Sequence, residues 1–126
     1  MKRFKDRVRE LWDARQSKTN KQMRDQWEQW LRGWIDYYRI GESRPVARLE
    51  SWIRRRIRCY DWQRWHKAKG RCAKLRKLGV NPEQAKAGRS SRGAWRMAKH
   101  PAMHTALSNA ALRKARILMP TQLRAW

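Results

Sequence analysis

Residues 30–65 read WLRGWIDYYRIGESRPVARLESWIRRRIRCYDWQRW, and this stretch decides the fold. Apolar residues recur at steps of three and four over residues 23–38 and again over residues 46–60, as they do on one face of a helix. Between the two patterns, Gly41 is suited to end the first helix and Pro45 to occupy the first turn of the second. The stretch therefore predicts two long helices that are joined by a short turn and lie side by side. The residues predicted to face the core are Met23, Trp27, Trp30, Leu31, Trp34, Ile35, Tyr38, Val46, Leu49, Ile53, Ile57 and Tyr60.

The opposite face of the second helix carries a row of cations, which we call the arginine stripe. Its members recur at helical spacing, roughly 180° from the apolar face at ~100° per residue, and no acid lies among them. An arginine side chain matches the geometry of a phosphate, and a tryptophan ring offers a surface on which a base stacks. A solvated face is the alternative, but such a face normally mixes charges of both signs. We expect the stripe to face solvent and to contact nucleic acid; it comprises Arg44, Arg48, Arg55, Arg58 and Trp62, flanked by Arg54 and Trp65.

The composition indicates a polyanionic partner. The chain has 126 residues and a net charge of +23, with 33 Lys and Arg against 10 Asp and Glu. Self-repulsion at this charge opposes compaction until a polyanion neutralises it, so nucleic acid is the expected partner. An anionic membrane is the alternative, but membrane-surface helices usually carry Lys and one continuous apolar face. No segment approaches the ~20 apolar residues that cross a bilayer, and neither a membrane partner nor a signal or transit peptide is predicted.

The rest of the chain predicts short helices. Apolar residues recur at helical spacing over about the first fourteen residues, and Asn81 followed by Pro82 is a helix start. Residues 89–93 predict a small cationic loop, and no stretch indicates a strand. The predicted fold class is all-α, a small helical bundle built on a two-helix hairpin with short accessory helices. We divide it into a lead-in amphipathic helix, residues 1–15, and a helical nucleic-acid-binding domain, residues 16–126. The candidate helix caps are Thr19 or Asn20, Asn81, and Ser108 or Asn109.

No catalytic constellation is found in the sequence. The ten acids are scattered, whereas two-metal phosphoryl transfer needs carboxylates that are held close together. No glycine-rich phosphate loop or metalloprotease motif occurs. Cys59 and Cys72 are expected to be reduced, and neither forms the paired motif of a zinc site. We therefore predict no enzymatic activity for the chain on its own, no catalytic residue, no metal and no cofactor.

Four segments resemble one known family. They are LRGWIDYYRIGES at residues 31–43, WIRRRIRCYDWQRW at residues 52–65, FKDRVREL at residues 4–11, and KLRKLGVNPEQAKAGRSSRGAWRMAKHPAMHTALSNAAL at residues 74–112. Together they look like the maturase-specific domain, or domain X, of bacterial group II intron-encoded proteins. The resemblance covers nearly the whole chain, and the combination of Gly33-Trp34, Tyr37-Tyr38 and the Trp-Ile-Arg-Arg-Arg run is fairly specific.

The resemblance implies a function in RNA splicing. In that family the domain is the thumb that follows a reverse transcriptase; it holds intron RNA in its splicing-active fold and also holds the template–primer duplex. The chain has no polymerase palm, no Tyr-Ala-Asp-Asp motif and no HNH nuclease, so only the RNA-binding part is implied. We expect either a fragment of a longer, mobile-element-encoded protein or a stand-alone remnant, located in the bacterial cytoplasm.

Three functions stay open at this point. The first is a maturase domain that binds group II intron RNA; the second is a thumb that acts only with a reverse transcriptase palm on an RNA–DNA duplex; the third is a small helix-turn-helix protein that binds DNA. The third fits least well, because a purely cationic stripe suits contact with the backbone better than reading of base edges. The candidate RNA-binding residues are Arg39, Arg44, Arg48, Arg54, Arg55, Arg58, Trp62, Arg64, Trp65, Lys67, Lys69, Arg89 and Arg92.

Overall fold

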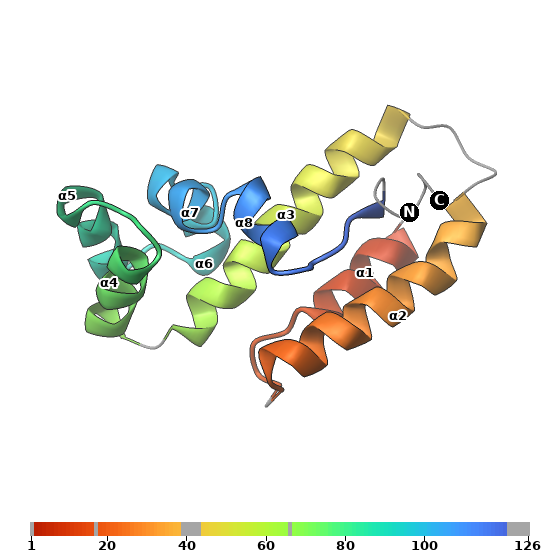
Figure 1. Cartoon of the computed structure of the whole chain (residues 1–126), viewed down its shortest axis with the longest axis horizontal. Helices are drawn as coiled ribbons and strands as arrows, with labels where there is room; N and C mark the ends of the chain where they lie inside the picture. Colours follow the sequence, from red (N-terminus) through yellow and green to blue (C-terminus); the bar gives the residue numbers. More distant parts are fainter. Residues whose placement is uncertain (1, 17, 39–43, 66, 121–126) are drawn as a thin grey trace.

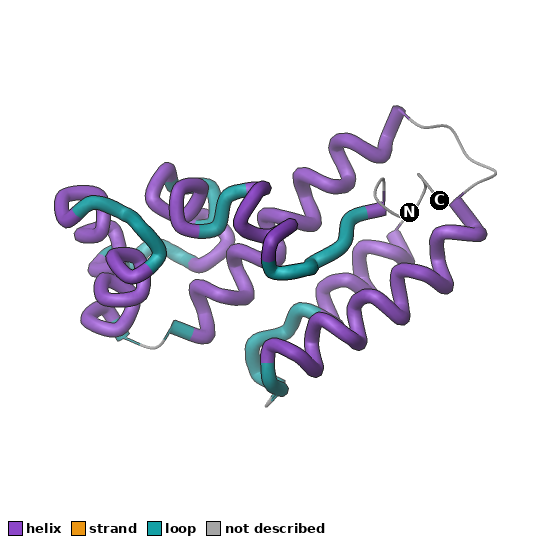
Figure 2. The backbone as a smooth tube through the Cα atoms, viewed as in Figure 1, coloured by secondary structure: helices purple, strands orange, loops and turns teal. Residues whose placement is uncertain are grey.

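The computed structural model describes residues 2–16, 18–38, 44–65 and 67–120, and these residues form helices joined by loops (Figures 1 and 2). No strand occurs among them, so the predicted all-α class is confirmed. The expected turn residue Gly41 lies outside the described residues. In chain order the elements are α1 (Lys2–Leu11), α2 (Asn20–Tyr38), α3 (Arg44–Arg64), α4 (Ala68–Lys77), α5 (Pro82–Ala85), the 3-10 helix η1 (Lys86–Arg89), α6 (Ala94–Met97), α7 (Pro101–Ala106) and α8 (Asn109–Lys114).

Helix α3 lies between two hydrophobic clusters. Figure 1 shows α1 and α2 on one side of this long helix and the short helices α4 to α7 toward its C-terminal end. The first cluster joins α1, α2, the apolar face of α3 and the C-terminal segment. The second cluster joins the end of α3 to α4, α5, α6 and α7. The first comprises Phe4, Val8, Leu11, Trp12, Met23, Trp27, Leu31, Leu49, Ile53, Ile57, Tyr60, Leu112 and Met119, and the second Trp62, Leu75, Val80, Ala85, Met97, Ala102, Met103 and Ala106.

The apolar face predicted for the second long helix is confirmed. Ile53 and Ile57 are fully buried, and Leu49 and Tyr60 are nearly so. Helix α1 packs into the same cluster, because the Phe4 ring lies 5.1 Å from the ring of Trp30, measured between centroids. The lead-in helix therefore shares one core with the two long helices.

The helix starts follow the local sequence. At the start of α2 the Gln22 backbone N–H donates to Thr19 Oγ1 at 3.1 Å, and Gln22 Oε1 accepts from the Thr19 N–H at 3.0 Å, which is a capping box. Asn81 Oδ1 caps α5 by accepting from the Gln84 N–H at 2.8 Å, and Ser108 Oγ caps α8 by accepting from the Ala111 N–H at 3.1 Å. Gly79 follows α4 with φ of +95°, a conformation that favours glycine. These local contacts confirm the candidate caps at Thr19, Asn81 and Ser108.

The C-terminal segment is held against α2. The indole Nε1–H of Trp27 donates to the Leu118 carbonyl at 2.7 Å, and Arg24 donates to the Ala115 carbonyl at 3.3 Å. Figure 1 shows this segment leaving α8 and running toward α1 and α2. The chain therefore returns to its first cluster after building the second one.

Candidate nucleic-acid interface

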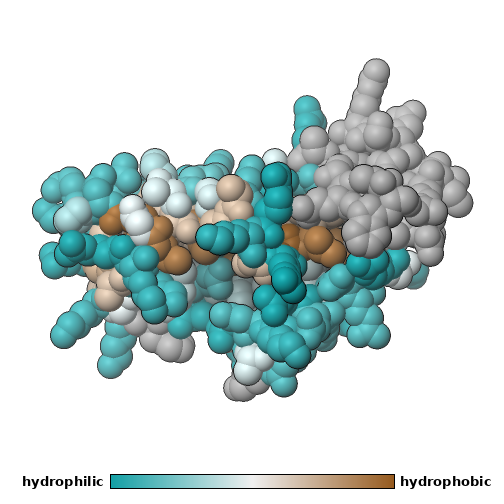
Figure 3. All heavy atoms as spheres, in the orientation of Figure 1, coloured by the Kyte–Doolittle hydropathy of each residue, from teal (hydrophilic) through white to brown (hydrophobic). Residues whose placement is uncertain are grey.

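Acidic side chains do little to neutralise the surface as a whole. In the part of the chain that the structure describes, seven acids pair with a nearby Lys or Arg at nitrogen–oxygen distances of 2.7 to 4.0 Å. Seven pairs offset only a minority of the 33 cations, so most of the positive charge on the surface stays unneutralised. The face shown in Figure 3 is accordingly hydrophilic over most of its area, with an apolar band across its middle.

The prediction that Arg58 faces solvent is wrong. Arg58 is 3% exposed, its Nε donates to the Leu107 carbonyl at 2.7 Å, and its Nη2 donates to Asn109 Oδ1 at 3.0 Å. Burial lowers the pKa of its guanidinium, and the positive charge of Arg54 lowers it further. Arg58 therefore fastens α3 to Leu107 and to the first residue of α8, through its Nε and Nη2 donors.

The same correction applies to Trp62. This ring is 1% exposed and belongs to the second cluster, where the Arg71 guanidinium lies 4.8 Å from the ring centroid. Trp65 is half-buried and packs against that cluster. The reason is that α4 to α7 cover the side of α3 that helical periodicity predicts to be exposed. Only part of the arginine stripe is therefore exposed.

Two further candidates take part in structural contacts. Arg54 is half-buried and pairs with the buried carboxylate of Glu50 at 3.3 Å. Arg64 donates to Asn20 Oδ1 at 2.8 Å and to the Tyr60 hydroxyl at 3.0 Å, which links α3 to the start of α2. Both cations add positive potential, but their geometry is set by these partners.

Eight candidates remain. Arg39 and the side chain of Arg44 lie outside the described residues, and Arg55 belongs to a group of side chains described in the next paragraph. The other five are exposed and lie on α3, at or near the start of α4, and around the loop that precedes α6. They are Arg48, Lys67, Lys69, Arg89 and Arg92.

A compact group of cations and aromatic rings forms on the exposed side of α3, which we call the cation–aromatic patch (Lys5, Arg9, Trp52, Arg55 and Trp95). Trp95 is 36% exposed and lies under the Arg55 guanidinium, whose carbon is 3.9 Å from the ring centroid. Arg55 also donates twice to the Trp95 carbonyl, at 2.8 and 3.0 Å. These contacts hold the Arg55 guanidinium over an exposed ring.

The second ring of the patch is built from α1 and α3. Lys5 Nζ and the guanidinium carbon of Arg9 each lie 5.2 Å from the centroid of Trp52. The Trp52 and Trp95 centroids are 6.3 Å apart, so the two rings form one continuous surface. Trp52 is half-buried and packs against the first cluster. It lies four residues after Arg48 and three before Arg55, which is the signal that places it on the arginine stripe. Nothing in the sequence pairs it with Trp95.

A basic cavity of about 430 Å³ adjoins the patch. Trp52 and Arg55 line both, so a chain that crosses the patch reaches the cavity. Burial lowers the pKa of the His104 imidazole, and the positive charge of Arg58 lowers it further, so this side chain adds little positive charge at neutral pH. Hydroxyl, amide and cationic groups in one hollow suit a phosphate oxygen. The lining residues are Ser51, Trp52, Arg54, Arg55, Arg58, Ala98, Lys99, His104 and Asn109.

The described residues contain no group of three or more His, Cys, Asp or Glu side chains placed to hold a metal ion. They also contain no helix with the length and apolar character that crossing a bilayer requires.

The fold and the patch define the class of protein, a small, strongly basic, all-helical domain. Residues 1–79 match the family model described as the group II intron, maturase-specific domain. This match covers more than half of the chain, and the protein belongs to that family. No curated protein matches the chain. Family membership implies a maturase-related role in group II intron splicing.

The match ends at residue 79 and leaves out one residue of the patch. It includes Lys5, Arg9, Trp52 and Arg55, whereas Trp95 lies beyond it. The resemblance of residues 74–112 to the same family therefore stays a prediction for most of its length.

Proposed function

We propose that this domain binds group II intron RNA and stabilises the fold in which that RNA splices. The observation that carries the proposal is the cation–aromatic patch on a member of the maturase-specific family. RNA loops present unstacked bases beside phosphates, and an exposed ring with a cation held against it binds both parts. A protein that binds the compact RNA better than the open RNA shifts the RNA toward the compact state.

The proposal includes the setting in which the domain works. We infer that it acts in the bacterial cytoplasm as the thumb of an intron-encoded, mobile-element protein, next to a reverse transcriptase palm. The scattered acids support a function in binding rather than catalysis for this chain, since most of the acids described are occupied by local ion pairs. Magnesium-dependent nucleotide addition by the 126-residue chain alone would overturn this part of the proposal.

The first test is the salt dependence of binding to structured intron RNA. If about 6 phosphates are neutralised, the plot of log K against log salt should fall with a slope of roughly −4 to −5. A flat response in an anisotropy titration would contradict RNA binding through phosphates. Duplex DNA that competes as well as intron RNA does would favour the alternative of a DNA-binding protein.

The second test separates the patch from diffuse charge. The double variant Arg9→Gln/Arg55→Gln removes two cations from the patch, and Arg76→Gln/Lys77→Gln removes two exposed cations from α4 as a matched control. The patch variant should flatten the salt slope by about 2, because each phosphate contact contributes about 0.9. It should also impair splicing of a cognate intron at low magnesium more than the control does. Equal effects of the two double variants would show that the patch has no special role.

A further inference from the structure

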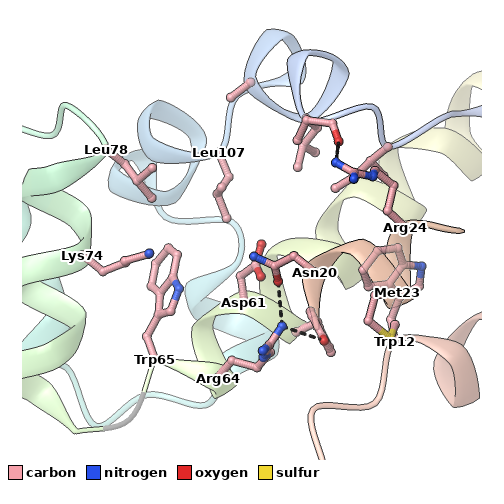
Figure 4. A pocket seen from close by; sticks show the side chains of 15 residues that line it. Trp12, Asn20, Met23, Arg24, Asp61, Arg64, Trp65, Lys74, Leu78 and Leu107 are labelled. Carbon is pink, nitrogen blue, oxygen red and sulfur yellow. Dashed lines mark hydrogen bonds between the residues drawn. The ribbon is translucent and has the colours of Figure 1, made fainter. Parts of the chain in front are cut away.

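A second cavity, of about 440 Å³, lies between α3, the start of α2, α4 and the segment that follows α7 (Figure 4). Pockets of this size hold small organic groups. In Figure 4, Lys74 and Trp65 lie on one side of it, Arg24, Met23 and Trp12 on the other, and Asp61 between them. The cavity has no lining residue in common with the cation–aromatic patch, so it is a separate site. Its lining residues are Trp12, Asn20, Met23, Arg24, Tyr60, Asp61, Arg64, Trp65, Lys74, Leu78, Leu107, Ala111, Leu112, Ala115 and Ile117.

Asp61 is the unusual group in this cavity. Within the part of the chain that the structure describes, its carboxylate has no hydrogen-bond or ion-pair partner. Arg64, one turn away on α3, donates instead to Asn20 and Tyr60. Burial raises the pKa of the Asp61 carboxyl to about 7, against the opposing effect of the Arg64 and Lys74 charges. Asp61 is half-buried and lines the cavity. Perturbed acids that line a cavity are typical of functional sites.

The groups around Asp61 match the parts of a nucleotide. Trp65 is half-buried and lines the cavity, so it supplies an aromatic surface for a base. Lys74 is exposed and Arg24 half-buried at opposite sides of the cavity, where they suit flanking phosphates. A polypeptide segment would need backbone partners along its length, whereas the cavity concentrates its polar groups around one carboxylate.

The carboxylate selects among the bases. The two oxygens of a carboxylate accept two parallel N–H bonds, and guanine presents adjacent N1–H and N2–H donors on its Watson–Crick edge. Adenine and cytosine present one exocyclic amino group beside an acceptor, and an acceptor opposite a carboxylate oxygen is repelled. Unpaired bases in RNA loops expose this edge and stack on aromatic rings.

We propose that this cavity binds an unpaired guanine base of the RNA, with Asp61 accepting its N1–H and N2–H and Trp65 stacking on its ring. The proposal rests on the RNA-binding function proposed above and adds a base-specific contact to it. The patch then supplies affinity through phosphates, and the cavity supplies a preference for one nucleotide.

The test compares guanine with inosine, which lacks only the N2 amino group. The single-stranded oligoribonucleotides UUUGUUU and UUUIUUU differ by this one donor, and their affinities for the 126-residue chain are measured by fluorescence anisotropy. We expect the guanine oligonucleotide to bind roughly 5-fold more tightly, because one of two base-edge hydrogen bonds is lost in the other. This comparison uses the unaltered protein and needs no variant to fold.

Two matched variants assign the preference to the cavity. Asp61→Asn should abolish the guanine preference, while Asp25→Asn, which removes an exposed carboxylate paired with Lys21, should retain it. Circular dichroism checks that both variants are folded. Trp65→Leu should weaken the binding of both oligonucleotides, since stacking is lost in each case.

The outcomes distinguish this proposal from the proposed function. Equal affinity for the two oligonucleotides, or a preference that survives in folded Asp61→Asn, overturns the guanine site and leaves RNA binding intact. Absence of binding to either oligonucleotide and to intron RNA overturns both proposals.

Discussion

Removing the buried guanidinium of Arg58 tests the reassignment of this residue from the surface to the interior. The substitution Arg58→Met keeps most of the aliphatic stem and deletes the donors to the Leu107 carbonyl and to Asn109 Oδ1. Both acceptors, the Leu107 carbonyl and Asn109 Oδ1, then lose their donor. The position of Arg58 on the arginine stripe instead predicts unchanged or improved stability, because one repulsive surface charge would be lost.

The expected loss follows from the two hydrogen bonds. A hydrogen bond from a charged donor stabilises a fold by about 1.5–3 kcal/mol, so two contribute roughly 3–6 kcal/mol. Two effects oppose this loss. Removing the guanidinium relieves its desolvation and its repulsion by Arg54, the two effects that lower the pKa of Arg58, and the Met side chain restores apolar packing. We expect the free energy of unfolding to fall by about 2–4 kcal/mol. At roughly 3–5 °C per kcal/mol for a domain of this size, Tm falls by roughly 6–20 °C.

The assay is thermal unfolding followed by circular dichroism, in enough salt to screen surface repulsion. Arg48→Met is the matched control, since Arg48 is exposed on the same helix and its loss should move Tm by about 2 °C or less. An equal, small shift in both variants would refute the reasoning. It would mean that the Arg58 guanidinium is solvated, as the sequence pattern predicts.

Two further predictions concern stability. The folded-state pKa of Asp61 is about 7, above the ordinary value of 3.8, so the folded chain holds a proton between these pH values that the unfolded chain has released. The free energy of unfolding of the wild type should therefore fall as pH rises from about 4 to 7. In urea unfolding, the stability difference between Asp61→Asn and wild type should be about 1–3 kcal/mol more favourable to the variant at pH 8 than at pH 5. An identical difference at both pH values contradicts this. Gly88→Ala should cost about 1–3 kcal/mol, because the added Cβ would lie 2.6 Å from the backbone nitrogen of Cys72, whereas Gly93→Ala meets no atom within 4 Å and serves as the control.

The helices, their caps and the main apolar face were predictable from the sequence. Helix formation depends on neighbours three and four residues apart, and the capping pair of Thr19 and Gln22 is such a pair of close neighbours. The burial of Ile53 and Ile57 follows from the same periodicity. The family, too, is recognisable from continuous segments, because residues 1–79 carry it.

The exposed surface was decided only by the tertiary structure. Helical periodicity defines the faces of α3, but which face is covered depends on segments that return from far along the chain. Leu107 and Asn109 reach back to Arg58 and bury it, and Trp95 arrives beside Trp52 and Arg55 and creates the cation–aromatic patch. Asp61 is one acid among ten in the sequence, and only the packing of α2, α4 and the C-terminal segment around it makes a cavity. Such contacts depend on loop closure and side-chain packing across distant elements, for which a single sequence carries no local pattern.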